Sequence, residues 1–179
     1  MGNDGGTGDL RPILFLDVDG VVSPIAGGHL GPLPTTWESW RKLRWSLPAW
    51  TAPDCVSRLT ALPVERIWCS TWGQMVDGER GLSGQLGWSG MRWLRLPPGD
   101  RPWSKRRAIE GWFAESGTRA FIWADNDLRL DSSGRPWAQR LSVPSLLIRP
   151  HKNVGLTPRH LEAMERWVGD LGAPGSAGP

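Results

Sequence analysis

The sequence predicts an α/β protein with three layers, a Rossmann-like fold around a central, mainly parallel five-stranded sheet. Short apolar runs, too brief for helices, recur along the chain, and amphipathic helical patterns lie between most of them. Near-continuous apolar runs are typical of parallel strands that are buried on both faces. The expected strands cover residues 13–19, 65–71, 91–96, 119–125 and 145–149.

Three helices are expected where a capping residue precedes apolar residues at helical spacing. Asp54 is expected to cap the first helix and Ser104 the second. Thr157 is expected to cap the last one, with Pro158 in its first turn. The stretch 73–87 favours helix only weakly because five glycines interrupt it.

The chain is expected to form a single domain over residues 10–169. Its 179 residues and 39% hydrophobic content are sufficient for one full core. Residues 1–9 and 170–179 are rich in glycine and are expected to be disordered tails. A membrane span needs about 20 apolar residues, no run approaches that length, and no signal peptide is evident, so a soluble, cytoplasmic protein is expected.

Composition limits the candidate partners. The formal net charge of +3 is compatible with an anionic substrate but does not establish a nucleic-acid partner. The two cysteines, Cys55 and Cys69, are too few for a disulfide framework and are interpreted as structural. Trp72 is interpreted as a packing residue, and neither a membrane nor an obligate protein partner is evident.

Three carboxylates occur where expected strands end. Asp17 and Asp19 close the first strand, and Asp125 closes the fourth. In a parallel sheet, ligands bind beyond the carboxyl ends of the strands, so these side chains are expected to form a cluster. Carboxylates held close together repel one another, and hard oxygen ligands suit Mg²⁺. A calcium-binding loop is excluded because its frame would place Phe15 and Ala26 at ligand positions.

Two further strand and helix ends supply groups that phosphate chemistry requires. Ser70 and Thr71 close the second strand with hydroxyls that can donate to a phosphoryl oxygen. Lys105 opens a helix, where the helix dipole also favours anions. Together with the carboxylates, these residues form a pattern typical of phosphoryl transfer.

These motifs resemble those of the haloacid dehalogenase (HAD) superfamily of phosphohydrolases. Its first motif, a hydrophobic strand followed by Asp-x-Asp-Gly, is similar to "FLDVDGVV". The other three resemble "IWCST", "WSKRRAIEGWF" and "FIWADND", in the same order along the chain. More narrowly, "STWG", "WSK" and "WADND" look like a small bacterial HAD-like group with a small or absent cap.

The resemblance implies a mechanism for the chain. Asp17 would attack phosphorus and form an aspartyl-phosphate intermediate, and Asp19 would act as general acid and then as general base. Mg²⁺ would be held by the Asp17 carboxylate, the Asp19 main-chain carbonyl and Asp125. Ser70, or Thr71 if the strand register differs by one, would bind the phosphoryl group together with Lys105.

The fourth motif departs from the family pattern. Many relatives have adjacent acidic residues there, whereas Asn126 follows Asp125 and the next carboxylate is Asp127. Asp127 is therefore a candidate metal ligand. If it does not supply the missing charge, Mg²⁺ binding would be weak or the activity would be modified.

The substrate class stays open at this point. A nucleotide, a sugar phosphate and a phosphorylated nucleic-acid end all fit the resemblance. The insert at about 23–52 lies where the superfamily places a cap, and its tryptophans either roof the site or anchor a Pro-rich loop. The stretch 92–107 holds six basic residues against one acidic residue, and Trp93 and Trp103 within it would suit a nucleotide.

Two other functions are alternatives to a phosphohydrolase. One is a noncatalytic HAD-like module that binds phosphate or nucleic acid, for which Asn126 is the main support. The other is a nucleic-acid-binding protein that relies on the basic stretch alone; a steep salt dependence of binding would identify it.

Overall fold

The computed structural model describes residues 11–27, 31–44, 49–77, 80–98, 103–129 and 133–172. Seven strands and seven helices are found within them. The strands are β1 (Ile13–Leu16), β2 (Arg41–Lys42), β3 (Trp50–Thr51), β4 (Glu65–Trp68), β5 (Arg92–Trp93), β6 (Phe121–Ala124) and β7 (Ser145–Ile148). The helices are α1 (Pro53–Ala61), α2 (Leu82–Leu86), α3 (Trp103–Ser116), α4 (Gly134–Arg140), α5 (Pro158–Gly172) and the 3₁₀ helices η2 (Gly73–Val76) and η3 (Asn126–Arg129).

Five strands form one parallel sheet in the order β5-β4-β1-β6-β7. Along the chain, β4 and β5 are added on one side of β1, and β6 and β7 are then added on its other side. The order therefore reverses between β1 and β6, which is the topological switch point where ligands bind in such sheets. The predicted α/β class and parallel sheet are confirmed, although every strand is shorter than the sequence predicted.

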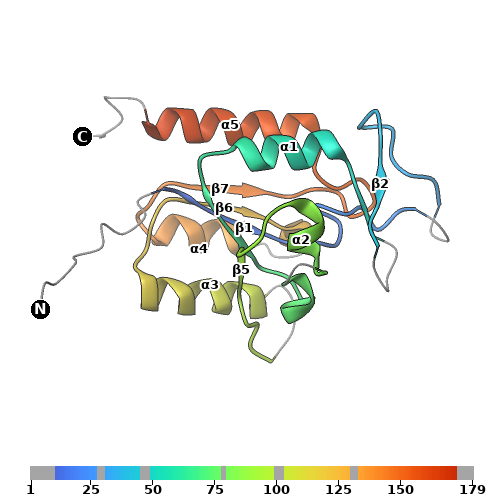
Figure 1. Cartoon of the computed structure of the whole chain (residues 1–179). Coiled ribbons are helices and arrows are strands. Elements are labelled where there is room, and N and C mark those ends of the chain that lie inside the picture. Colours follow the sequence, from blue (N-terminus) through green and yellow to red (C-terminus); the bar gives the residue numbers. More distant parts are fainter. Residues whose placement is uncertain are drawn as a thin grey trace, which may run out of the picture.

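Helices cover both faces of the sheet and give it three layers (Figure 1). Helices α1 and α5 lie on one face, and α3 and α4 lie on the other. The first interface contains Leu59 and Met164, and the second contains Ile109 and Trp137. Side chains of successive strand residues alternate between these two interfaces, which explains why the strands read as uninterrupted apolar runs.

The observed helix boundaries correct several expectations. Asp54 and Ser104 lie in the first turns of α1 and α3 instead of capping them; α1 begins at Pro53, whose fixed φ suits the first helical position. The last helix begins directly after Thr157, as predicted. No helix in the described part of the chain is long and apolar enough to span a membrane.

Helix α4 and the end of helix α5 were not predicted correctly. No helical pattern was recognised for α4, whose first turn contains glycine and proline. Helix α5 extends to Gly172, three residues past the expected domain end, because half-buried Leu171 continues its apolar face. The glycine-interrupted stretch 73–87 forms η2 and α2, in agreement with its weak helical signal. The expected tail at 1–9 lies outside the described residues. Of the expected tail at 170–179, residues 170–172 belong to α5 instead, and residues 173–179 lie outside the described residues.

The described part of the 23–52 insert forms a small antiparallel ribbon of β2 and β3. Its tryptophans anchor the loop: the indole N–H of Trp37 donates to the carbonyl oxygen of Leu156, and that of Trp40 donates to the carbonyl oxygen of Pro34. Both rings pack against the core between the sheet and α5. Of the two alternatives for these tryptophans, anchoring therefore describes Trp37 and Trp40.

Candidate active site

Two buried carboxylates lie side by side at the switch point of the sheet. Leu16 of β1 pairs with Ala124 of β6, so the next residues, Asp17 and Asp125, leave neighbouring strands at the same level. The N–H of Asp17 donates to the carbonyl oxygen of Ala124 at 3.1 Å. Because side chains alternate along a strand, both carboxylates project toward the face that α3 covers, like Phe15 two residues earlier.

Lys105 brings a buried ammonium group to these carboxylates from the first turn of α3. Its Nζ lies 2.6 Å from Oδ2 of Asp17 and 2.9 Å from Oδ2 of Asp125, and the side chain is only 1% exposed. Burial alone would lower the pKa of Lys105, but the charges of Asp17 and Asp125 outweigh it and hold the pKa above its ordinary value. Lys105 is therefore a permanent cation in the site.

Asp127 supplies a third carboxylate to the same cluster. Its Oδ2 lies 3.4 Å from Nζ of Lys105, and its backbone N–H donates to Oδ1 of Asp125 at 2.8 Å. Asn126 donates its side-chain amide to Oδ1 of Asp127 at 3.1 Å. The turn of η3 thus places the carboxylate two residues beyond Asp125 in the cluster, while Asn126 orients it.

The cluster fits a divalent cation. Carboxylate oxygens of Asp17, Asp125 and Asp127 all lie within 4.8 Å of one another. Oδ2 of Asp125 is buried and accepts no hydrogen bond from the described residues, since its contact with Lys105 lacks hydrogen-bond geometry. Three carboxylates face one ammonium group, so the ionised cluster carries two excess negative charges, which one Mg²⁺ would neutralise.

The pKa of Asp125 reflects the same excess of negative charge. Burial of the side chain, and then the charge of Asp17, raise the pKa of Asp125 to about 7, although Lys105 acts in the opposite direction. A carboxyl group with a pKa raised to this extent needs a nearby cation to stay ionised. The donor set of hard oxygens is the kind that Mg²⁺ prefers.

Asp19 lies at the exposed edge of the site and is oriented by Trp72. The indole N–H of Trp72 donates to Oδ2 of Asp19 at 2.8 Å. The side chain of Asp19 does not belong to the metal-binding cluster of the described residues, which leaves its main-chain carbonyl as the predicted ligand atom. The interpretation of Trp72 as a packing residue was incomplete. Its position two residues beyond Ser70, at the same edge of the sheet, was the available signal.

Gly20 permits the sharp turn that carries Asp19 past the end of β1. Its φ is +69°, a left-handed value that favours glycine. A Cβ atom at this position would lie 2.9 Å from the side chain of Asn126 and from the backbone of Lys152. The glycine of the Asp-x-Asp-Gly motif is therefore required both by backbone conformation and by close packing against η3.

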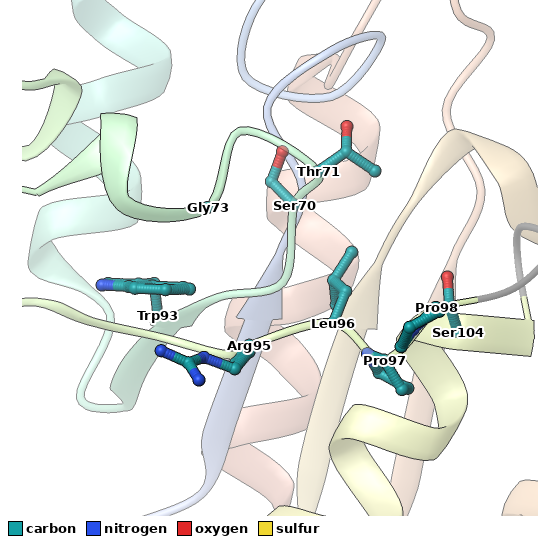
Figure 2. A pocket seen from close by; sticks show the side chains of 9 residues that line it. All are labelled: Ser70, Thr71, Gly73, Trp93, Arg95, Leu96, Pro97, Pro98 and Ser104. Carbon is teal, nitrogen blue, oxygen red and sulfur yellow. The ribbon is translucent and has the colours of Figure 1, made fainter.

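The two hydroxyl residues at the end of β4 line a cavity of about 390 Å³. Ser70 is buried, and its Oγ accepts the backbone N–H of Trp72 at 3.3 Å, whereas Thr71 is exposed. Ser104, which directly precedes Lys105, lines the same cavity (Figure 2). Ser70 and Thr71 both remain candidates for phosphate binding.

Comparison of the chain with protein-family models, with curated proteins and with solved structures finds no match. The functional inference therefore depends on two observations: the motifs of the sequence, and the geometry of the side chains that they bring together. Asp17, Lys105, Asp125 and Asp127 converge, Asp19 lies beside them with Trp72, and Ser70 and Thr71 face an adjoining cavity.

Proposed function

We propose that the protein is a Mg²⁺-dependent phosphohydrolase that acts on phosphomonoesters through an aspartyl-phosphate intermediate. The observation that carries the proposal is the buried contact of Lys105 with three carboxylates at the switch point of the sheet. A purely structural cluster would not need an excess of buried negative charge, which is costly in a protein interior. The resemblance of the four motifs to the HAD superfamily supports the same function.

In the first half of the reaction, Asp17 is the nucleophile. One of its carboxylate oxygens attacks phosphorus and forms a new P–O bond, while the bond between phosphorus and the ester oxygen breaks. Asp19 donates a proton to the departing oxygen. Lys105 and the hydroxyl of Ser70 or Thr71 bind the phosphoryl oxygens and compensate their charge.

In the second half, water attacks the phosphorus of the aspartyl phosphate. Asp19, now a carboxylate, accepts a proton from this water, and the bond between phosphorus and Asp17 breaks. Inorganic phosphate leaves, and both aspartates return to their starting states. Trp72 keeps Asp19 oriented in both steps through its hydrogen bond.

The metal would be held by Asp17, Asp125 and Asp127, together with the main-chain carbonyl of Asp19. When bound, Mg²⁺ supplies positive charge that stabilises the phosphoryl oxygens in the transition state. Lys105 remains protonated and reduces the repulsion among the carboxylates before substrate binds.

Release of inorganic phosphate tests the proposal directly. We expect turnover of a panel of mononucleotides, sugar phosphates and 3′- or 5′-phosphorylated oligonucleotides with Mg²⁺, and none with chelator. Asp17→Asn removes the nucleophile with little change in volume and should abolish turnover. Asp54→Asn, which neutralises an exposed carboxylate on α1, is the matched control and should retain it.

A second measurement detects the intermediate. After acid quenching during turnover, mass spectrometry of the wild-type protein should find one phosphate on the peptide that contains Asp17. Folded protein that releases no phosphate from any ester would contradict the proposal. Binding of inorganic phosphate without turnover would then favour the noncatalytic module.

A further inference from the structure

The cavity beside Ser70 and Thr71 adjoins the candidate active site. One wall is the turn after β4, and another is the first turn of α3, where Ser104 precedes Lys105. Figure 2 shows the segment 93–98 crossing the opposite wall, with Trp93 and Arg95 far from Ser104. A phosphoryl group bound at the hydroxyls would therefore direct the rest of its ester into this cavity.

The cavity is lined by groups of two kinds. Its hydroxyl groups belong to Ser70, Thr71 and Ser104, next to the proposed catalytic residues. The remaining wall consists of the aromatic or apolar side chains of Trp93, Leu96, Pro97 and Pro98 and of one cation, Arg95. A site for the hydroxyl groups of a sugar would need polar partners along this wall, whereas a planar ring needs an aromatic or apolar surface.

Trp93 offers its ring to such a ligand. Among the described residues, no aromatic ring and no cation covers Trp93, whereas Arg92 and Arg119 lie 5.6 and 5.2 Å from the ring centroid of Trp112. Trp93 is half-buried against the core and close to Gly73, where a Cβ would lie 3.8 Å from Cζ3 of its ring, and the part of Trp93 that stays accessible lines the cavity (Figure 2).

Arg95 adds hydrogen-bond donors beside this ring. Its side chain is exposed, and within the described ranges no carboxylate forms an ion pair with it. An unpaired guanidinium presents donors that match the acceptor edge of a base such as guanine. The cavity volume of about 390 Å³ lies within the range typical of small-ligand sites.

We propose that this cavity binds the nucleoside part of the substrate, with the base stacked on Trp93 and its edge facing Arg95. The inference rests on the proposed phosphohydrolase function and specifies its substrate as a nucleoside phosphate. A second cavity, also of about 390 Å³, shares Trp93, Arg95 and Pro97 with the first.

The test compares two ligands that differ only by the base. Guanosine 5′-monophosphate and ribose 5-phosphate carry the same phosphate and the same sugar. Stacking of the base on an aromatic side chain, together with the contacts of the base edge, should make kcat/KM of the nucleotide roughly tenfold to a hundredfold higher than that of ribose 5-phosphate. Calorimetric titration of both ligands into the Asp17→Asn variant with Mg²⁺ should give the same preference in Kd, without catalysis.

Substitutions of Trp93 and Arg95 assign the preference to the cavity. Trp93→Leu should bring the ratio of the two ligands close to one, and Trp93→Phe should restore much of it because an aromatic face returns. Arg95→Gln, at an exposed side chain, should lower the ratio without affecting folding. Trp167→Leu, which removes a half-buried indole on α5 that does not line the cavity, is the matched control and should leave the ratio unchanged.

The outcomes separate this inference from the proposed function. Mg²⁺-dependent turnover of both esters at equal kcat/KM, or a preference that survives Trp93→Leu and Arg95→Gln, would overturn the nucleoside site and leave the phosphohydrolase intact. Absence of turnover together with a tenfold preference in Kd would retain the nucleoside site and overturn the enzyme. Equal Kd values for the two ligands would overturn the nucleoside site.

Discussion

Single hydrogen bonds determine how the candidate active site is organised, and the bond from Trp72 to Asp19 is the most informative. Trp72→Phe keeps an aromatic ring in the core but removes the indole N–H that donates to Oδ2 of Asp19 at 2.8 Å. We expect kcat to fall by about tenfold with little change in KM, because the proton donor loses its orientation while phosphate binding is retained. Steady-state kinetics on one ester measures both constants.

Trp88→Phe is the control for this change. The indole N–H of Trp88 donates to the hydroxyl of Thr60 at 2.7 Å, outside the candidate site. This variant loses the same type of hydrogen bond and should show reduced stability with an unchanged kcat. Equal effects of the two substitutions on kcat would show that Trp72 acts through stability alone.

The two thiols illustrate how burial controls reactivity at the scale of a residue. Burial raises the pKa of Cys55 to about 12, although Arg58 acts to lower it, and burial also raises the pKa of Cys69 well above its ordinary value. Both thiols therefore stay protonated near neutral pH. Titration with an aromatic disulfide reagent should detect no reactive thiol in the folded protein and two after unfolding. Rapid reaction of either thiol without denaturant would contradict this expectation.

Between elements, one ion pair joins the two helices that share a face of the sheet. Arg58 of α1 donates Nε and Nη2 to the two carboxylate oxygens of Glu165 in α5, at 2.8 and 2.6 Å. The hydrogen bond from Arg58 lowers the pKa of Glu165. The contribution of this ion pair to stability is therefore present above the ordinary pKa of a glutamate and is lost as the pH falls through the lowered pKa of Glu165.

The ion pair should contribute little because both side chains are partly exposed to solvent. We expect a coupling of less than about 1 kcal/mol near neutral pH, from a double-mutant cycle of Arg58→Gln and Glu165→Gln in urea unfolding. The coupling should disappear in acid. A coupling that persists after Glu165 is protonated would contradict the assignment to an ion pair.

The elements also show which parts of the fold could be predicted from the sequence. Apolar runs identified all five strands of the main sheet, because burial on both faces demands such runs. Position at a strand end was sufficient to bring Asp17 and Asp125 together, since adjacent parallel strands end at one edge. The contributions of Asp127 and Trp72 depended on the turns that follow β6 and β4, and apolar periodicity contains no information about turn geometry. Helix α4 was also missed, because a helix of only seven residues shows too little apolar periodicity to be recognised.

Over the whole molecule, the active-site cluster couples metal binding to stability. Without a cation, the folded protein holds three carboxylates within 4.8 Å of one another around a single lysine, whereas unfolding separates them and returns them to water. A ligand that binds only the folded state stabilises it according to its concentration relative to Kd. At about 100 times Kd, Mg²⁺ should add about 2.7 kcal/mol and raise Tm by roughly 5–10 °C.

Asp127→Asn distinguishes a metal ligand from a structural carboxylate. The amide oxygen can still accept the hydrogen bond from Asn126, but one negative charge leaves the cluster. In chelator, we expect Tm of this variant to equal or exceed that of the wild type, because repulsion is relieved. With Mg²⁺, its gain in Tm should be much smaller. Scanning calorimetry of both proteins in both conditions gives the four values required.

The control is Asp170→Asn, which neutralises an exposed carboxylate near the end of α5 and should keep the full gain with Mg²⁺. If Asp127→Asn instead lowers Tm in chelator and keeps the full gain with Mg²⁺, the carboxylate of Asp127 stabilises the fold as a partner of Lys105 and is not a ligand. The missing acidic residue at position 126 would then not be replaced, and a cation would have to be held by Asp17 and Asp125 without Asp127.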